Sequence, residues 1–195
     1  MGKLEKLFVN SPSHSQQVSQ HADRLLNLID VKAGQKYLDV GCGNGTAAIH
    51  VAQKYHLDVT GIDVDPTQIR LAEAQSRGLD NARFLTIDGT QQPFEDAQFD
   101  VVFTNKVTHH IPNWREALVE MMRVIKLGGY FIYSDLVLPL PFARLGEAVA
   151  GNRIGFPTKN ELEAMLKARD FVTIHRASHM VHFEGIFQRY GKKLI

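Results

Sequence analysis

The sequence predicts an α/β protein of three layers, α-β-α, with a mostly parallel, doubly wound seven-stranded sheet and an antiparallel strand near the C-terminus. Apolar runs typical of buried strands alternate with helical patterns from residue 36 to residue 134, and such alternation favours right-handed crossovers and a parallel sheet. Glycines at positions 41, 43 and 45 follow the first run and precede a helical pattern. Residues 172–177 and 181–189 resemble two strands joined by a short turn, which indicates an antiparallel pair.

Length and composition indicate one globular domain over residues 1–195. The formal net charge of +1 gives no electrostatic reason to expect a nucleic acid or an anionic membrane as the main partner. Cys42 is the single cysteine, so no internal disulfide can form. No run is long and apolar enough to span a bilayer and the first residues lack a signal-peptide core, so we expect a cytoplasmic protein.

The first expected element is a helix in the N-terminal segment 1–30. Ser13 is expected to cap it, because serine is a preferred residue before the first helical position. Its apolar residues recur at helical spacing: Val18, Ala22, Leu25, Leu26 and Ile29.

Strands are expected next at residues 36–40, 58–62 and 82–87, with a helix after each of the first two. Pro66 is expected to start the second of these helices, since proline is favoured at the first helical position. The residues expected to face inward from this helix are Ile69, Leu71 and Ala72.

Residues 99–104 form a continuous apolar run of the kind that is buried on both faces of a sheet. A helix is expected to follow and to stop at Gly128-Gly129, before a strand at 130–134. Its apolar face consists of Trp114, Ala117, Leu118, Met121, Met122 and Ile125.

The last third of the chain interrupts the strand–helix alternation. Residues 136–157 contain three prolines and indicate a cap-like insertion. A capped helix is expected at 158–168, since Thr158 stands three residues before Glu161.

The glycine-rich turn predicts a site for a nucleotide-type cofactor, because glycine lets the backbone approach a ligand closely and a helix N-terminus follows. The run from Gly43 to Ala48 also satisfies the dinucleotide pattern with Ala in the last place, and Asp63 stands 20 residues beyond Gly43, so glycine spacing alone leaves NAD open. Asp39, two residues before the first glycine, would repel a pyrophosphate and attract a cationic group. Asp88-Gly89 after the third strand is placed to accept a hydrogen bond from an adenine amine.

Five segments in order resemble the class I, seven-stranded, Rossmann-like methyltransferases that use S-adenosylmethionine (SAM), in the small-molecule branch that includes the ubiquinone and menaquinone C-methyltransferases. They are residues 38–46, 61–66, 88–100, 105–111 and 120–129. Leu127 departs from the proline and Gln92 from the leucine that this family often has. After the fourth strand the chain reads Asn-Lys-Val-Thr and lacks the Asp/Asn-Pro-Pro-Tyr/Phe signature of nucleic-acid and protein amide methyltransferases, so no nucleic-acid substrate is expected.

The resemblance implies a role for each matching residue. The glycines Gly41, Gly43 and Gly45 would close on the methionine part of SAM, and Asp39 would face its amino group. The remaining cofactor contacts would come from Asp63 on the ribose hydroxyls, Val64 on the adenine face, Asp88 and Gly89 on the adenine edge, and Asn105 near the methyl group.

His109 and His110 are the candidate catalytic bases, since imidazole titrates near neutral pH. The alternative is that one packs against the following helix and the other borders the site without proton transfer. Tyr133 and Asp135 are weaker candidates. The three later histidines are His175, His179 and His182. No metal site is expected there, because these histidines have no cysteine or carboxylate partner at ligand spacing. Cys42 is interpreted as a small buried residue and not as a nucleophile.

The resemblance implies methyl transfer to a small, partly hydrophobic acceptor, with S-adenosylhomocysteine (SAH) as the product. In this fold residues 1–20 and 136–157 would face the acceptor, and their apolar residues are Phe8, Leu138, Leu140, Phe142, Leu145 and Phe156. A homodimer is compatible with these features. Two alternatives stay open: a regulatory protein that binds SAM or SAH without catalysis, and an NAD(P)-dependent oxidoreductase.

Overall fold

Seven strands make up the sheet in the order β3-β2-β1-β4-β5-β7-β6, which confirms the predicted α/β fold class. The computed structural model describes residues 12–138, 142–143, 155 and 157–191. The chain divides into two compact units, Met1–Ile87 and Asp88–Ile195.

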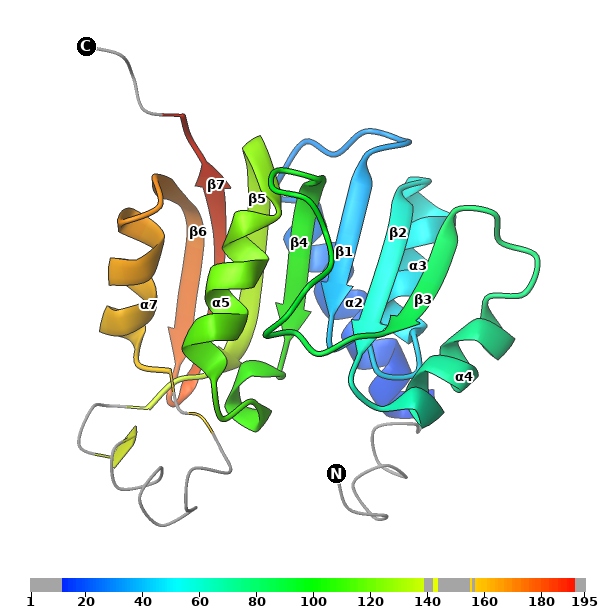
Figure 1. Ribbon diagram of the computed structural model, residues 1–195, viewed down its shortest axis with the longest axis horizontal. Helices are drawn as coiled ribbons and strands as arrows, with labels where there is room; N and C mark the ends of the chain where they lie inside the picture. Colours follow the sequence, from blue (N-terminus) through cyan, green and yellow to red (C-terminus); the bar gives the residue numbers. More distant parts are fainter. Residues whose placement is uncertain (1–11, 139–141, 144–154, 156, 192–195) are drawn as a thin grey trace. The chain divides into compact units, whose positions relative to one another are not determined.

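The first unit is a three-stranded parallel sheet with helices between its strands (Figure 1). Helices α2 and α3 pack against each other, and α4 contacts β2 and β3. The parallel register places Asp39 opposite Gly61 and Val40 opposite Ile62, just before both strands end. The elements are α2 (Pro12–Leu26), β1 (Lys36–Val40), α3 (Thr46–Tyr55), β2 (Asp58–Asp63), α4 (Pro66–Gln75) and β3 (Ala82–Thr86).

Two expectations for the helices of this unit are wrong. Ser13 is not the residue before the first helical position of α2, because the helix already includes Pro12. Leu71 does not face inward and is 39% exposed. Successive helical residues are turned by about 100°, so Leu71 points away from the face that Ile69 and Ala72 share. Gln68 is the further buried residue on that face.

The second unit has four strands, and α5 and α7 lie over the same face of them (Figure 1). Its strand β4 is buried over most of its length, as the continuous apolar run predicts. A 3₁₀ turn, η1 (Thr108–His110), separates β4 from α5. The other elements are β4 (Phe99–Asn105), α5 (Trp114–Arg123), β5 (Ile125–Leu136), α7 (Lys159–Lys167), β6 (Phe171–His179) and β7 (His182–Arg189).

The boundary between α5 and β5 differs from the prediction. The helix ends at Arg123 and the strand begins at Ile125, which pairs with Phe99, so the Gly128-Gly129 pair lies inside the strand. The register then jumps to Val101 opposite Tyr130. Gly128 has a φ of +80°, and a Cβ on Gly129 would lie 2.8 Å from the Asp100 carbonyl oxygen. The two glycines therefore form an irregularity in the strand and do not end the helix.

The C-terminal part confirms the antiparallel pair and the helix cap. Strand β7 runs antiparallel to both β5 and β6. Thr158 Oγ1 accepts a hydrogen bond from the Glu161 amide at 3.3 Å and donates one to Glu161 Oε2 at 2.7 Å. Most of the predicted cap-like insertion 136–157 lies outside the described residues, as do Phe8, Leu140, Leu145 and Phe156. Among the described residues, no helix is long and apolar enough to cross a membrane.

Candidate functional site

The turn after β1 depends on three glycines in the left-handed region. Their φ angles are +77° at Gly41, +54° at Gly43 and +80° at Gly45, a conformation that other residues rarely adopt. The Gly41 amide donates to the Ile62 carbonyl at 2.8 Å, and the Gly45 amide donates to the Cys42 carbonyl at 3.0 Å. The turn is thus tied to β2 and leads directly into α3.

Gly43 and Gly45 have different surroundings. A Cβ on Gly45 would lie 2.7 Å from Ala72 Cβ and 2.9 Å from Phe84 Cε1, so this glycine is also needed for packing. A Cβ on Gly43 would meet nothing within 4 Å. Gly43 therefore leaves open space beside the turn, as a backbone that closes on a ligand requires.

Asp63, at the end of β2, is hydrogen-bonded to the glycine turn. Its Oδ2 accepts from the Gly43 amide at 3.0 Å, and its Oδ1 accepts from the Asp65 amide at 2.8 Å. Each oxygen of an ionised carboxylate has a second acceptor position, so the side chain can still take two hydroxyl donors. Val64, next in the chain, is 70% exposed. The sequence indicated a ligand role for Asp63 but did not reveal that it also holds the glycine turn.

Asp39 lies in β1 just before the turn and is 3% exposed. Burial, helped by the charge of Asp63, raises the pKa of Asp39 to about 7. A nearby cation would restore the charged form, because an opposite charge favours the ionised carboxylate. Burial, together with the charges of Asp39 and Asp63, also raises the pKa of the Cys42 thiol well above its ordinary value. Cys42 is half-buried and not fully buried as expected, whereas its raised thiol pKa agrees with the interpretation that it is not a nucleophile.

In the second unit, Asp88 and Gly89 stand at the start of a structured loop. Asp88 Oδ1 accepts from the amide and the hydroxyl of Thr90, each at 2.8 Å. The Gly89 carbonyl accepts from Gln92 Nε2 at 3.1 Å. Asn105 is the last residue of β4 and is half-buried. Lys106 follows it in the left-handed region, with a φ of +57°.

The His109 side chain is hydrogen-bonded to Asp135, a fully buried residue of β5. His109 Nδ1 lies 2.5 Å from Asp135 Oδ1, and the exposed fractions of the two side chains are 14% and 0%. Asp135 also accepts from the amides of Val107, Thr108 and Leu136 and from the Thr108 hydroxyl, at 2.6–3.0 Å. Burial by itself would raise the pKa of Asp135, but the bonds from His109, Thr108 and Leu136 hold it below its ordinary value. Asp135 is therefore ionised and orients His109.

The Thr108 hydroxyl extends this arrangement to Tyr133. Its oxygen lies 2.6 Å from Asp135 Oδ2 and 2.9 Å from the Tyr133 hydroxyl. Because an ionised carboxylate can only accept, Thr108 donates to Asp135 and Tyr133 donates to Thr108. Burial, with the charge of Asp135, raises the pKa of Tyr133 well above its ordinary value. Neither Tyr133 nor Asp135 is therefore suited to act as a base, and no local sequence signal indicates Thr108 for this role.

The two adjacent histidines are not equivalent. His110 is exposed, and its ring centroid lies 3.9 Å from that of His109. Farther along the chain, His175 Nε2 lies 3.3 Å from Glu184 Oε1, and His182 Nε2 lies 3.1 Å from Ser134 Oγ. Within the part of the chain that the structure describes, no three His, Cys, Asp or Glu side chains are placed to hold a metal ion.

Comparison with known proteins identifies relatives of this chain. A family described as a methyltransferase domain matches residues 38–133. The 27-O-demethylrifamycin SV methyltransferase of Amycolatopsis mediterranei is 32% identical over 137 residues, which cover 68% of this chain and 50% of that protein. The demethylmenaquinone methyltransferase of Staphylococcus aureus is 29% identical over 201 residues, with 82% and 83% covered. The chain thus spans half the length of the first of these relatives and most of the second.

Solved structures show the same fold. The structure of a geranyl diphosphate methyltransferase in complex with SAM matches with a TM-score of 0.72 at 14% sequence identity, over 91% of this chain and 90% of that one.

Proposed function

The chain belongs to the class I family of SAM-dependent methyltransferases, and we propose that the protein moves the methyl group of SAM to a small, partly hydrophobic acceptor. The observation that carries this proposal is Asp39, a carboxylate that is 3% exposed and whose pKa is raised to about 7 beside the glycine turn. A cationic ligand would stabilise its charge, whereas the pyrophosphate of a dinucleotide would oppose it.

The first unit supplies the residues that we assign to the methionine and ribose parts of SAM. Gly43 leaves open space for close approach, Asp39 faces the amino group, and Asp63 accepts from the ribose hydroxyls with its remaining acceptor positions. Gly41 and Gly45 hold the shape of the turn. The exposed Val64 side chain is available to cover the adenine face.

The second unit carries the other proposed contacts. Asp88, Gly89 and Asn105 are assigned to the adenine edge and the methyl group, and this assignment rests on the sequence resemblance. When bound, SAM supplies a methyl group already activated by a positive sulfur, so the chain's own residues need only align the acceptor and exclude water.

His109 is the proposed base where the acceptor atom must lose a proton. Because Asp135 is ionised and can only accept, His109 Nδ1 carries a proton and donates it. In the neutral ring, Nε2 is then the free acceptor that can take the proton of the acceptor atom. His110 borders this position and makes no hydrogen bond to Asp135 among the contacts described.

We propose a hydrophobic small molecule as the acceptor for two reasons. The named relatives are methyltransferases of demethylmenaquinone and of a demethylrifamycin. Phe142, in the described part of the insertion after β5, is 63% exposed. A cytoplasmic location and a homodimer stay predictions from the sequence.

The test is to incubate the protein with SAM and a panel of small hydrophobic acceptors that includes reduced demethylmenaquinone, and to measure SAH release and acceptor mass. We expect SAH to form only in the presence of a suitable acceptor, which gains the mass of one methylene. Tight SAH binding without turnover on any acceptor would instead favour the regulatory alternative. A thermal shift with NAD(H) and none with SAH would favour the oxidoreductase.

A further inference from the structure

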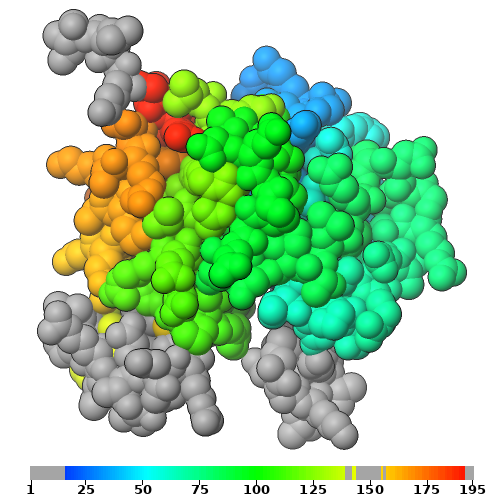
Figure 2. All heavy atoms as spheres, viewed as in Figure 1, coloured from blue at the N-terminus to red at the C-terminus, as the bar shows by residue number. Residues whose placement is uncertain are grey.

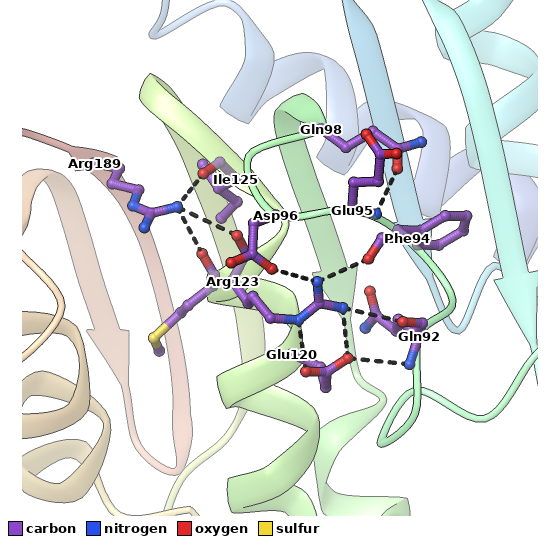
Figure 3. A network of polar contacts seen from close by, with 10 residues as sticks. Gln92, Phe94, Glu95, Asp96, Gln98, Glu120, Arg123, Ile125 and Arg189 are labelled. Atoms are coloured by element: carbon purple, nitrogen blue, oxygen red, sulfur yellow. Dashed lines mark hydrogen bonds and ion pairs between the residues drawn. The ribbon is translucent and has the colours of Figure 1, made fainter.

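Arg123, at the C-terminal end of α5, uses all five of its N–H donors (Figure 3). Two go to Glu120 in a bidentate pair, Nε to Oε1 and Nη2 to Oε2, each at 2.8 Å. The other three reach the loop between β3 and β4: the carbonyl of Gln92 at 3.0 Å, the carbonyl of Phe94 at 2.7 Å and Asp96 Oδ1 at 2.8 Å. A guanidinium whose five donors are all engaged has one orientation and fixes the groups that it binds.

The loop residues held in this way are directly connected to Asp88 and Gly89. Glu120 Oε2 accepts from the backbone amide of Gln92 at 3.2 Å, so Gln92 is hydrogen-bonded through both its backbone amide and its backbone carbonyl. The Gln92 side chain, which is 5% exposed, donates to the Gly89 carbonyl at 3.1 Å. The Gln91 amide donates to the Asp88 carbonyl at 3.0 Å. A continuous series of hydrogen bonds therefore runs from the guanidinium of Arg123 to the Gly89 carbonyl.

The far end of the loop is attached to the same part of α5. The Ala97 amide donates to the Arg123 carbonyl at 3.1 Å, and the Gln98 amide donates to the Val124 carbonyl at 2.8 Å. Ala97 itself has a φ of +55°, a strained value for a residue with a Cβ. Figure 2 shows that the loop and α5 adjoin on the same face of the surface. The loop thus lacks regular secondary structure yet is fixed at both ends by one helix terminus.

We propose that Arg123, paired with Glu120, is a positioning residue that sets adenine selectivity by holding the Asp88–Gly89 segment through Gln92. This inference rests on the proposed function, in which that segment reads the adenine edge. Arg123 acts through the loop and touches neither the cofactor nor the acceptor.

Arg189 provides a matched control in the same region (Figure 3). Its guanidinium donates to the carbonyls of Met122, Arg123 and Ile125, at the junction of α5 and β5. The contacts described for it include no residue of the 88–98 loop. Loss of Arg189 therefore disturbs the end of α5 without releasing the loop.

The experiment measures the dissociation constants of SAH and of S-inosylhomocysteine, in which oxygen replaces the 6-amino group of adenine, by calorimetry. We expect wild-type protein and R189Q to prefer SAH by about tenfold or more, because the analogue has an acceptor oxygen at the position where the adenine amine would donate to a carboxylate. In R123Q the preference should fall to within about twofold, with SAH binding weakened about tenfold. R123K should retain an intermediate preference, since lysine keeps the charge but not the bidentate geometry.

The outcomes separate the two proposals. If R123Q is folded by circular dichroism and keeps the wild-type ratio of the two constants, Arg123 has no positioning role. If R189Q loses the ratio as R123Q does, the effect belongs to the helix end and the inference is also wrong. If wild-type protein binds no SAH, the proposed function itself is overturned. Should R123Q fail to fold, R123K carries the test: a folded R123K protein that keeps the wild-type ratio of the two constants would overturn the positioning role.

Discussion

Two buried aspartates, Asp39 in the first unit and Asp135 in the second, have opposite electrostatic surroundings. Both stand at or near the end of a strand, and their exposed fractions are 3% and 0%. Burial raises the pKa of Asp39 to about 7, and Asp63 adds to the effect. Burial alone would also raise the pKa of Asp135. The hydrogen bonds from His109, Thr108 and Leu136 outweigh this effect and lower the pKa.

The difference shows that the partners of a buried carboxylate, and not its burial alone, decide what it can do. Asp135 is saturated by protein donors, so its charge is part of the folded structure and its effect is to orient His109. Asp39 carries a charge that the protein alone does not stabilise, which is typical of a group that meets its partner in a ligand.

Replacing Asp135 should give the largest effect. We expect Asp135→Asn to lower the free energy of unfolding by about 3–5 kcal/mol, because an amide nitrogen would face donors that now bind a buried charge. The measurement is urea unfolding at pH 5 and pH 8. Since the pKa of Asp135 lies below 3.8, its stabilising charge is lost only when the pH falls below that range, so the loss should be the same at both pH values. A variant as stable as wild type would contradict the claim that hydrogen-bond donors of the protein stabilise the buried charge of Asp135.

Replacing Asp39 should act in the opposite direction. In the folded state its pKa is about 7 against an ordinary 3.8, so the folded protein binds more protons than the unfolded chain between these values, and stability falls as pH rises through them. A difference of about 3 pKa units corresponds to about 4 kcal/mol at most, so we expect Asp39→Asn to raise the free energy of unfolding by about 2–4 kcal/mol at pH 8.

Two further measurements sharpen the Asp39 prediction. The gain in stability should be smaller by about 2–3 kcal/mol at pH 5 than at pH 8, where the wild-type carboxylate is charged. The same variant should bind SAH about tenfold more weakly or worse, because the ligand's ammonium loses its counter-charge. Unchanged SAH affinity would show that Asp39 serves the turn and not the cofactor.

The third prediction separates the adjacent histidines. We expect His109→Gln to lower kcat by about 100-fold, or about 2.7 kcal/mol, on an acceptor that must lose a proton. His110→Gln should stay within about threefold of wild type, since His110 is exposed and its ring is tilted against that of His109. The readout is kcat, measured as SAH formation at saturating SAM and acceptor for both variants. Equal losses in both variants would argue against a single oriented base.

Much of the fold could be predicted from the sequence because its signals are local. The first strand matches its predicted bounds, and Pro66 begins α4 as expected. The glycines at 41, 43 and 45 all have positive φ. Two expectations were wrong: Ser13 lies within α2, which already includes Pro12, and Gly128-Gly129 forms an irregularity within β5 where a helix stop was expected.

The candidate site could be predicted only in part. Asp39 and Asp63 follow from their places beside the glycine turn, and His109 follows from its place after a buried strand. The role of Asp135 as the partner of His109 could not be found, because the two residues stand 26 positions apart and meet only through the pairing of β4 with β5. The contacts of Arg123 with Gln92 and Phe94 join residues 31 and 29 positions apart, so they could not be found from the sequence either.

The strand and helix pattern, the backbone of the glycine turn and the acids beside it follow from the sequence, since periodicity and glycine conformation are properties of neighbouring residues. Tertiary structure alone decided which buried aspartate is saturated and which is not, which histidine is oriented, and what holds the loop that begins at Asp88. These depend on hydrogen bonds and burial among residues distant in the chain, and a pKa or an orientation is set by that surrounding and not by residue type.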